Sequence, residues 1–287
     1  MIAFRLAAVL ALQWAAPAFS QAADTPITIG RAHAIASRHL GDTRIVNIYL
    51  PEGYAKGSKR YPVLYLIDGG LDQDFLHVVG SAQLGAIWGR SEPVIVVGVE
   101  TKDRRRELVG PTGDPALLKK YPTAGHSAAF RAYLRDEVKP FVARHYRVSG
   151  EDSVIGESLA GLFVVETYLR DPDLFDRYAA ISPSLWWDKE ALLREADALV
   201  ARQKRVPQRL YVATAEEGPE MQAADERLVR ALRDSRAPRT WCHAPHREAT
   251  HATIYHMVVP EALQYLWPTP TPPAPEMGFV VPCSQKS

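Results

Sequence analysis

The clearest chemical signal is a serine set between an apolar strand-like run and an apolar helix-like run. Residues 152–156 read Asp-Ser-Val-Ile-Gly, and residues 159–169 continue as Leu-Ala-Gly-Leu-Phe-Val-Val-Glu-Thr-Tyr-Leu. Between them, Ser158 has Gly156 two residues before it and Ala160 two residues after it. Small residues at these positions allow the strained turn that lifts a serine hydroxyl above a sheet edge. The pattern predicts that Ser158 is a nucleophile, and the alternative is a helix N-cap.

A serine hydroxyl attacks a carbonyl only when a base removes its proton, and histidine is the usual base. Four histidines lie late in the chain, namely His243, His246, His251 and His256. The base should lie in the loop between the last strand and the closing helix, which we expect at residues 244–259. We choose His251, in the middle of that loop, with His246 as the second candidate. His243 is expected in the strand and His256 towards the helix.

The histidine of such a group is usually oriented by a carboxylate, which should follow the next-to-last long strand. That strand is expected at residues 209–214, and Ala-Glu-Glu-Gly-Pro-Glu follows it directly. Glu217 is the best candidate and Glu216 the runner-up, while Asp188 follows one strand earlier and ranks lower. The alternative is that these glutamates only favour the start of the next helix through its dipole.

A tetrahedral intermediate at an ester carbonyl needs backbone N–H groups aimed at its oxyanion. One donor should be the N–H of Leu159, directly after the nucleophile, and the other should come from the loop after the third strand. That loop reads Asp-Gly-Gly-Leu at residues 68–71, and glycine lets a backbone N–H approach a substrate closely. We assign the second donor to Gly70, with Leu71 as the alternative.

The elements that must position these groups follow from the apolar runs. Residues 62–67 and 93–99 are continuous apolar runs, typical of strands buried on both faces of a sheet. Strand-like and helix-like segments alternate from residue 127 onwards, which predicts an α/β fold with a mostly parallel sheet and helices on both faces. Gly41-Asp42 lies between two β-rich stretches and predicts an antiparallel N-terminal hairpin. The expected helices are 127–145, 159–169, 189–201, 220–232 and 260–266, and the later strands are 152–156, 178–181, 209–214 and 239–243.

A long charged loop is expected at residues 101–125, after a buried strand and at the edge where open α/β sheets bind ligands. Its candidate substrate-binding cations are Arg104, Arg105 and Arg106. A solvated charged loop is the alternative. Trp186 and Trp187 also follow a strand end, and we expect one of them, Trp187, to form an aromatic wall for an acyl or aryl group. Core packing is the alternative for both.

The composition limits the classes of partner. The 287 residues include 34 Lys+Arg and 33 Asp+Glu, so the formal net charge of +1 provides no field that would attract nucleic acid. A small-molecule partner is therefore expected. The late histidines are not spaced like common zinc motifs, and we expect neither a metal nor another cofactor. Cys242 and Cys283 can form one bridge at most, and the sequence leaves their pairing open.

The first twenty residues carry the features of a secretory signal peptide. Arg5 precedes the apolar run 6–14, and Ala18 and Ser20 fit the small-residue positions of a signal-peptidase site. The run is shorter than the ~20 residues that span a bilayer, which disfavours an uncleaved anchor. We expect an exported protein, periplasmic or secreted, with no membrane association after cleavage. The expected divisions are a signal peptide at 1–20, one α/β domain at 21–267 and a proline-rich tail at 268–287.

Several segments together resemble the putative-esterase branch of the α/β-hydrolases, which includes esterase D-like proteins and periplasmic siderophore esterases that cleave enterobactin-type trilactones. The likeness runs from about Ile27 to Leu266, and its motifs occur in the family's order. The segments are residues 61–70, 94–99 with 104–107, 130–141, the Ser158 turn, 181–187 and 250–253. The resemblance implies an α/β-hydrolase fold with Ser158 as nucleophile and His251 as base.

The resemblance also bears on the substrate. It implies that residues 104–106 lie where siderophore esterases meet anionic catecholate ligands. Some members of that group work with a Ser–His dyad, which leaves the role of Glu217 open. The sequence departs from the siderophore-esterase pattern at Glu157, Leu159 and Ala160, where those enzymes carry a histidine, an aromatic residue and a glycine. Family membership survives these differences, whereas siderophore specificity is weakened.

The sequence therefore predicts an exported serine hydrolase that cleaves carboxylic esters, with a siderophore trilactone among the candidate substrates, through an acyl-enzyme on Ser158. Two alternatives remain. One is an acyltransferase of the same fold, in which an alcohol other than water takes the acyl group. The other is a non-catalytic protein that binds a ligand on a hydrolase scaffold. The sequence leaves the ester and the oligomeric state undetermined.

Overall fold

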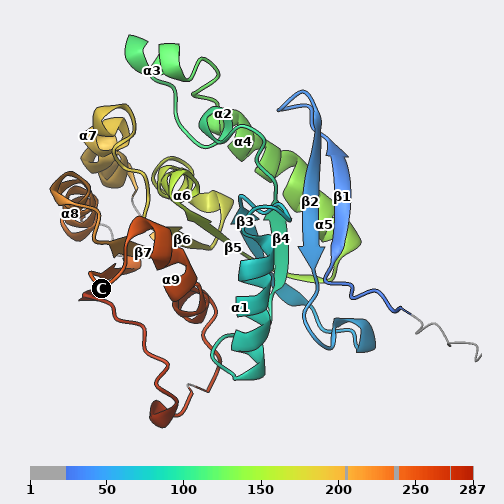
Figure 1. Ribbon diagram of the computed structural model, residues 1–287. Coiled ribbons are helices and arrows are strands. Elements are labelled where there is room, and N and C mark those ends of the chain that lie inside the picture. Colours follow the sequence, from blue (N-terminus) through green and yellow to red (C-terminus); the bar gives the residue numbers. More distant parts are fainter. Residues whose placement is uncertain (1–23, 204–205, 236–238, 272, 287) are drawn as a thin grey trace, which may run out of the picture.

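A computed structural model describes residues 24–203, 206–235, 239–271 and 273–286, so the expected signal peptide lies outside the described residues. Within these ranges the strands form one nine-stranded sheet in the order β1-β2-β4-β3-β5-β6-β7-β8-β9 (Figure 1). The strands are β1 (Arg31–Ala36), β2 (Thr43–Tyr49), β3 (Tyr61–Ile67), β4 (Ile95–Val99), β5 (Val148–Glu157), β6 (Arg177–Ile181), β7 (Val206–Ala215), β8 (Arg239–His246) and β9 (Gln285–Lys286).

The strand directions confirm the predicted architecture. β1 and β2 form the antiparallel hairpin, and β2 also runs antiparallel to β4. From β4 through β3, β5, β6 and β7 to β8 every neighbouring pair is parallel, and only the two-residue β9 reverses direction at the far edge. The carboxyl ends of the parallel strands therefore meet along one edge, which is where open α/β sheets carry their sites.

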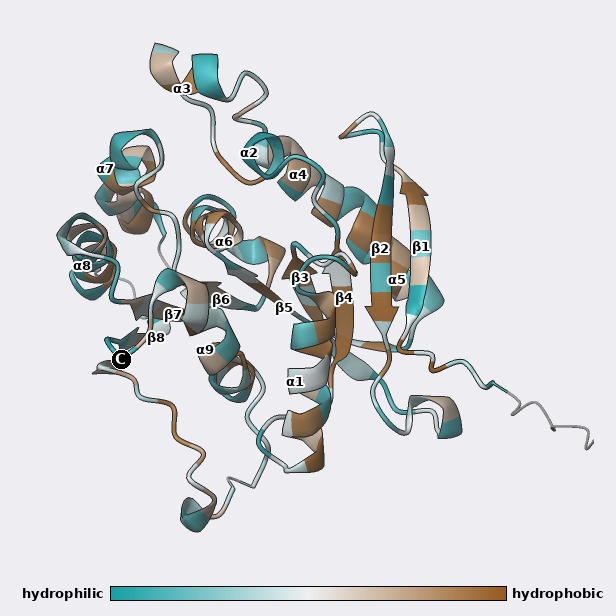
Figure 2. Cartoon of the chain, in the orientation of Figure 1, coloured by the Kyte–Doolittle hydropathy of each residue, from teal (hydrophilic) through white to brown (hydrophobic). Residues whose placement is uncertain are grey.

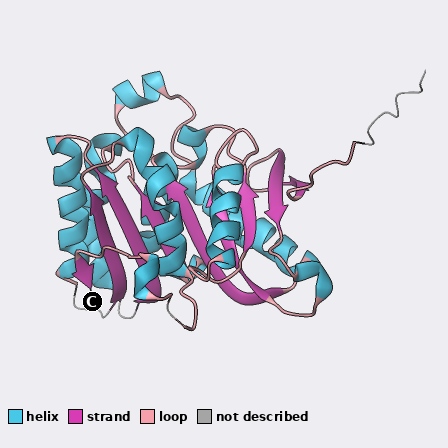
Figure 3. Ribbon diagram, turned by 60° about the horizontal axis from the view of Figure 1, so that its bottom comes forward, coloured by secondary structure: helices cyan, strands magenta, loops and turns pink. Residues whose placement is uncertain are grey.

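Helices cover both faces of the sheet (Figure 3). Apolar residues of α1 and α9 pack in one buried cluster, and those of α4, α5, α6, α7 and α8 pack in the other. No helix of the described ranges is long and apolar enough to cross a bilayer. The helices are α1 (Phe75–Ile87), α2 (Arg104–Glu107), α3 (Pro115–Lys120), α4 (Ser127–Tyr133), α5 (Lys139–His145), α6 (Leu159–Arg170), α7 (Trp187–Arg202), α8 (Pro219–Arg233) and α9 (His251–Leu266), with the short turns η1 (Tyr54–Lys56), η2 (Leu134–Val138), η3 (Pro172–Leu174) and η4 (Pro275–Met277).

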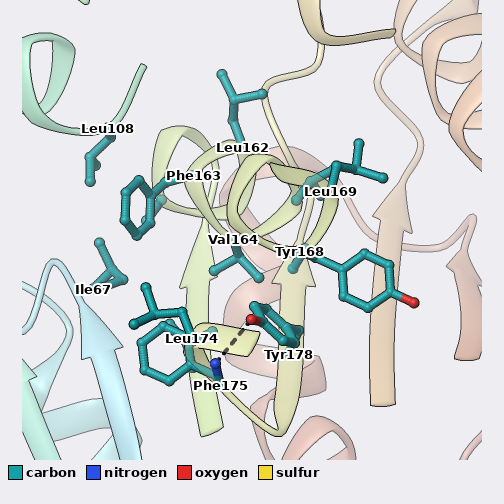
Figure 4. Close-up of a cluster of buried hydrophobic side chains, with 14 of the residues drawn as sticks. Ile67, Leu108, Leu162, Phe163, Val164, Tyr168, Leu169, Leu174, Phe175 and Tyr178 are labelled. Carbon is teal, nitrogen blue, oxygen red and sulfur yellow. Dashed lines mark hydrogen bonds between the residues drawn. The ribbon is translucent and has the colours of Figure 1, made fainter. Parts of the chain in front are cut away.

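The central strands are buried on both faces, as their continuous apolar runs predict. Every residue of β3 and of β4 is buried, and Figure 2 shows the strands of the sheet largely in the colour of hydrophobic residues. Helix α6, which follows the nucleophile, is buried over almost its whole length. Figure 4 shows Val164 and Tyr168 of α6 beside Tyr178 of β6, whose hydroxyl accepts a hydrogen bond from the backbone N–H of Phe175 at 3.1 Å. This packing fixes α6, and with it the residue that precedes it, against the sheet.

The closing helix begins earlier than predicted, and this corrects the expectation that His251 lies in mid-loop. Helix α9 starts at His251 itself, and Pro260 lies inside the helix. The start is set by a capping box, in which Thr250 and Thr253 each bond the other's backbone N–H. The predicted start at residue 260 was therefore late by more than two helical turns.

The segment predicted as a long charged loop contains two short helices. Asp103 caps α2 by accepting hydrogen bonds from the backbone N–H groups of Arg105 and Arg106, both at 3.1 Å. Asp114 caps α3 in the same way through the N–H of Ala116 at 2.8 Å. These caps satisfy backbone N–H groups at the helix starts, while Leu108 and Val109 of the same segment are buried in the core.

The C-terminal tail is attached to the sheet edge. Cys242 of β8 and Cys283 form a disulfide, and the side chain and N–H of Ser284 bond the backbone carbonyl of His243 at 2.9 and 2.8 Å. Earlier in the tail, the ring centroid of Phe279 lies 5.0 Å from the guanidinium carbon of Arg90. The tail thereby forms one wall of an apolar cavity of about 790 Å³ that it shares with α1 and α9.

We expect that Cys283→Ser lowers the free energy of unfolding by about 2–4 kcal/mol, because the bridge from Cys242 to Cys283 closes a long loop and so restricts the unfolded chain. Denaturant unfolding of the wild type and the variant, each with and without reductant, measures the effect. Reductant should bring the wild type to the variant's stability and leave the variant unchanged. Equal stability of both proteins without reductant would contradict a formed bridge.

Candidate active site

The turn between β5 and α6 places Ser158 above the carboxyl edge of the sheet. Its backbone has φ 61° and ψ −117°, a conformation that non-glycine residues rarely adopt. The turn requires small neighbours, because a Cβ built on Gly156 would lie 2.7 Å from the Cβ of Ala160. A Cβ on Gly161 would lie 2.7 Å from the carbonyl oxygen of Ile181, so this glycine allows α6 to pack closely on β6. The geometry is that of a nucleophile elbow.

The structure brings the predicted nucleophile, base and acid together from three separate loops. Ser158 Oγ lies 3.0 Å from His251 Nε2, and His251 Nδ1 lies 3.0 Å from Glu217 Oε1. Ser158 follows β5, Glu217 follows β7, and His251 opens α9 after β8. The two ring nitrogens thus have different partners, the serine hydroxyl on one side and a carboxylate on the other. This is the arrangement in which a carboxylate orients an imidazole towards a serine.

Two serines that sequence analysis did not select support this group. Ser182, directly after β6 and with φ 41°, donates its hydroxyl to Glu217 Oε1, and its Oγ lies 2.8 Å from His251 Nδ1. Ser184 Oγ lies 3.2 Å from Ser158 Oγ. Their sequence signal is the position of Ser-Pro-Ser at the end of the strand next to the elbow, which alone does not reveal these contacts.

Hydrogen bonding sets the protonation of the acid and the base. Burial acts to raise the pKa of Glu217, but the hydrogen bonds from His251 and Ser182 outweigh it and hold that pKa below its usual range. The hydrogen bond with Glu217 raises the pKa of His251, against burial, and the charge of Glu157 adds to the rise. Glu217 is therefore ionised at neutral pH, as an orienting carboxylate must be.

A further carboxylate lies at the same imidazole. Glu157 Oε1 lies 3.3 Å from His251 Nε2, the nitrogen that faces Ser158. The side chain of Glu157 is 17% exposed, and its burial raises the pKa to about 7, with Asp74 and Glu217 contributing to the rise. Sequence analysis noted this residue only as a departure from the siderophore-esterase pattern.

Arg104 is bound within the protein. Its Nε donates to Asp68 Oδ2 at 2.8 Å, and its Nη2 donates to the backbone carbonyl of Glu157 at 3.4 Å. Asp68 is buried, and Thr101 also donates its hydroxyl to it. Burial raises the pKa of Asp68, while Arg104 and Thr101 act to lower it. Arg104 thus tethers its loop to the strand that precedes the nucleophile.

The other predicted substrate-binding residues lie elsewhere. The guanidinium carbon of Arg105 is 4.1 Å from the ring centroid of Tyr121, and Arg106 is exposed. Trp187 is only 4% exposed and packs in the core, which corrects its expected role as a wall. Trp186, 45% exposed, takes that position instead. Of the two indoles, the one predicted as the wall is therefore buried and its neighbour is exposed.

A cavity of about 430 Å³ opens beside the nucleophile. Glu216 lies at its rim, where its Oε2 accepts a hydrogen bond from Gln222 Nε2 at 2.5 Å. The cavity therefore combines apolar, aromatic and acidic walls around the serine and the histidine. The described residues that line it are Ser158, Ser184, Trp186, Glu216, Glu217, Met221 and His251.

The alternative base and acid candidates have other partners. His246 is the last residue of β8, with its Nδ1 3.0 Å from Glu248 Oε1 and its Nε2 3.4 Å from Glu261 Oε1. His243 Nε2 lies 3.0 Å from Thr214 Oγ1, as expected for a strand residue. Asp188 lies in the first turn of α7.

The two predicted oxyanion donors, the N–H groups of Leu159 and Gly70, lie in different surroundings. Leu159 is the first residue of α6, so its N–H belongs to the end of the helix where the dipole is positive. The N–H of Gly70 donates to Gln73 Oε1 at 2.9 Å. Leu71 follows directly, with a 59% exposed side chain.

Comparison with known proteins places this geometry in a family. Residues 37–254 match the family model described as "Putative esterase". Ferri-bacillibactin esterase BesA of Bacillus subtilis is 29% identical over 174 residues, which are 54% of this chain and 58% of that protein. The matched part thus spans little more than half of BesA.

Solved structures agree with this match. An IroE-like serine hydrolase from Shewanella oneidensis superposes with a TM-score of 0.73 and 26% identity, covering 83% of this chain and 80% of that one. The siderophore hydrolase EstB from Aspergillus nidulans shares the fold at a TM-score of 0.70 and 18% identity, covering 88% and 99%. With the strand order, the elbow and the matched residues together, the chain has the α/β-hydrolase fold and belongs to the putative-esterase family.

Proposed function

We propose that the protein is a serine esterase that hydrolyses carboxylic esters through an acyl-enzyme on Ser158. The observation that carries this proposal is the aligned contact from Ser158 Oγ to His251 Nε2 and from His251 Nδ1 to Glu217 Oε1, each 3.0 Å long. The cavity that opens at the serine provides room for an ester beside this group.

The chemistry follows from the two faces of the imidazole. His251 Nε2 takes the proton of Ser158 as Oγ attacks the ester carbonyl, and Glu217 stabilises the imidazolium that forms. The imidazolium then gives that proton to the leaving alcohol oxygen as the ester C–O bond breaks. Water, deprotonated by the same nitrogen, attacks the acyl-enzyme and regenerates the serine. Ser182 supports the step by holding Glu217 and His251 in one orientation.

The oxyanion is held by backbone donors. The N–H of Leu159, at the start of α6, is the first donor we propose, since it directly follows the nucleophile. For the second donor we propose Leu71 rather than Gly70, because Gln73 already accepts a hydrogen bond from the N–H of Gly70. Leu71 lies one residue further along the same glycine-containing loop.

We also propose that the protein is exported by the segment 1–20. The composition of that segment is typical of a signal peptide. The bridge between Cys242 and Cys283 supports export, because disulfides persist in oxidising compartments.

A siderophore trilactone is the second substrate class that we propose to test. It is favoured by similarity to siderophore esterases, among them an enterobactin esterase of Emericella nidulans that is 35% identical over 95 residues. Those residues are 32% of this chain and 30% of that protein. The ion pair of Arg104 with Asp68 argues against it, because this cation is already neutralised within the protein.

Ser158→Ala should abolish hydrolysis of p-nitrophenyl esters from acetate to octanoate, because it removes the hydroxyl that His251 Nε2 contacts. The loss should reach at least about 10³-fold in kcat/KM, with a far-ultraviolet circular dichroism spectrum like that of the wild type. Ser149→Ala, at an exposed serine near the start of β5, is the control and should retain full activity. A trilactone siderophore, ferric and iron-free, is assayed beside the series. Undiminished turnover by Ser158→Ala would refute the mechanism.

Glu217→Gln tests whether the carboxylate is needed or a Ser–His dyad suffices. We expect kcat/KM to fall by about 10²–10⁴-fold, because the imidazolium loses its stabilising charge. The hydrogen bond with Glu217 raises the pKa of His251, so its loss should move the acid limb of the pH–rate profile to lower pH. Glu216→Gln removes a neighbouring carboxylate and should cause a much smaller loss. A loss below about threefold in Glu217→Gln would favour the dyad.

A further inference from the structure

Glu157 competes with the nucleophile for one nitrogen. His251 Nε2 lies 3.0 Å from Ser158 Oγ and 3.3 Å from Glu157 Oε1, while Nδ1 is engaged by Glu217. To act as a base, His251 must offer the lone pair of Nε2 to the serine hydroxyl. A proton shared between Nε2 and Glu157 occupies that lone pair, whether it is bonded to the nitrogen or to the carboxylate oxygen. The 3.3 Å contact with Glu157 therefore offers an arrangement in which the base is blocked.

The surroundings favour retention of this proton. Asp74, directly before α1, contributes to the raised pKa of Glu157, and burial raises the pKa of Asp74 itself to about 6. The opposing charges are His251 and Arg104, which act to lower the pKa of Glu157, and Arg104 is already paired with Asp68. The groups that face the pair are Asp68, Asp74, Arg104, Glu217 and the buried Tyr255 of α9.

The position of Glu157 also determines which part of an ester it would meet. Nε2 must deliver its proton to the leaving alcohol oxygen, so a group beside Nε2 lies on the leaving-group side of the scissile bond. The cavity at the serine also carries groups suited to a cation, because Trp186 and the carboxylate Glu216 line it; Glu157 itself is not among its described lining residues and reaches the site through His251. An exposed tryptophan face attracts organic cations, as carboxylates do.

We propose that Glu157 holds His251 in a blocked state in the free enzyme and releases it when a cationic group on the leaving alcohol of the ester binds the Glu157 carboxylate. The substrate class is thus an ester of an alcohol that carries a positively charged nitrogen. This inference rests on the proposed esterase activity for its catalytic part, whereas cation binding and the state of His251 can be measured without turnover. Glu157 acts on the reaction through His251 and is in that respect a positioning residue.

The first test is the titration of His251 by NMR, with its signal assigned from its loss in His251→Gln. In Glu157→Gln the pKa of His251 should fall by about one unit, because a nearby carboxylate stabilises the imidazolium by at least this amount. Glu216→Gln is the matched control, since it removes a carboxylate that lines the cavity beside Ser158 without contacting His251 Nε2, and its shift should be much smaller. An unchanged titration in a folded Glu157→Gln variant would overturn the proposal.

The second test uses choline and its neutral isostere 3,3-dimethylbutan-1-ol as probes in the same spectra. Choline should shift the His251 signal at concentrations at which the isostere does not, and Glu157→Gln should abolish the difference. An equal response to both probes, or a choline response that survives in Glu157→Gln, would refute the cation site. Circular dichroism and thermal unfolding show whether each variant is folded.

Kinetics connect the site to the reaction. At pH 8 the wild type should cleave acetylthiocholine with a kcat/KM at least about tenfold above that for 3,3-dimethylbutyl thioacetate, as expected for one effective ion pair. Glu157→Gln should lose this preference and gain activity towards neutral p-nitrophenyl esters below pH 7. A preference unchanged in Glu157→Gln would contradict the proposal. If no ester is cleaved in a Ser158-dependent manner, the proposed function fails, and the two NMR tests still decide the role of Glu157.

Discussion

The backbone of Ser158, held at a φ of 61° between β5 and α6, constrains much of the surrounding active-site geometry. Its N–H donates to the carbonyl of Ile181 at 3.0 Å, and its carbonyl accepts from the N–H of Ser184 at 3.0 Å. The turn is therefore joined to the segment after β6, which contains Ser182. That serine in turn bonds Glu217 and contacts His251. One strained residue thus aligns the nucleophile, the base and the acid, although they come from different loops.

The strained backbone of Ser158 persists because the close packing around it leaves no room for a relaxed conformation of the turn. Glycine at 156 and at 161 lets α6 approach both its own strand and the end of β6. Helix α6 is buried over almost its whole length, so any relaxation of the turn would displace a large apolar surface. A rare backbone conformation at a functional residue is stable when its surroundings determine it in this way.

Local sequence patterns predicted the sheet and the nucleophile, because both depend on neighbouring residues. The buried strands are continuous apolar runs, and the elbow needs only a strand, small residues and a helix. His251 lies beside Ser158, as a base must, but the start of α9 at His251 depends on a capping box that the predicted loop did not include.

The contacts of Ser182 and Glu157 could not be predicted from sequence. Ser182 follows β6 and Glu157 ends the adjacent strand β5. Each contacts His251 of α9, which lies far along the chain, so the contact depends on where side chains point in the folded protein. The choice between Trp186 and Trp187 has the same origin. The two residues are adjacent in sequence, and only the packing of the folded chain decides which indole is buried.

The site around Ser158 and His251 is acidic, because the nearby arginine is paired within the protein while several carboxylates lie at the site. Arg104 belongs to a run of three arginines that suggests affinity for anions, yet its guanidinium bonds the buried Asp68 and the backbone of the strand that precedes Ser158. Arg105 lies against Tyr121. The carboxylates of Glu157, Glu216 and Glu217, in contrast, lie around the serine and the histidine. Because charges within a partly buried site interact more strongly than charges in water, this imbalance disfavours an anionic group beside His251 and favours a cationic one.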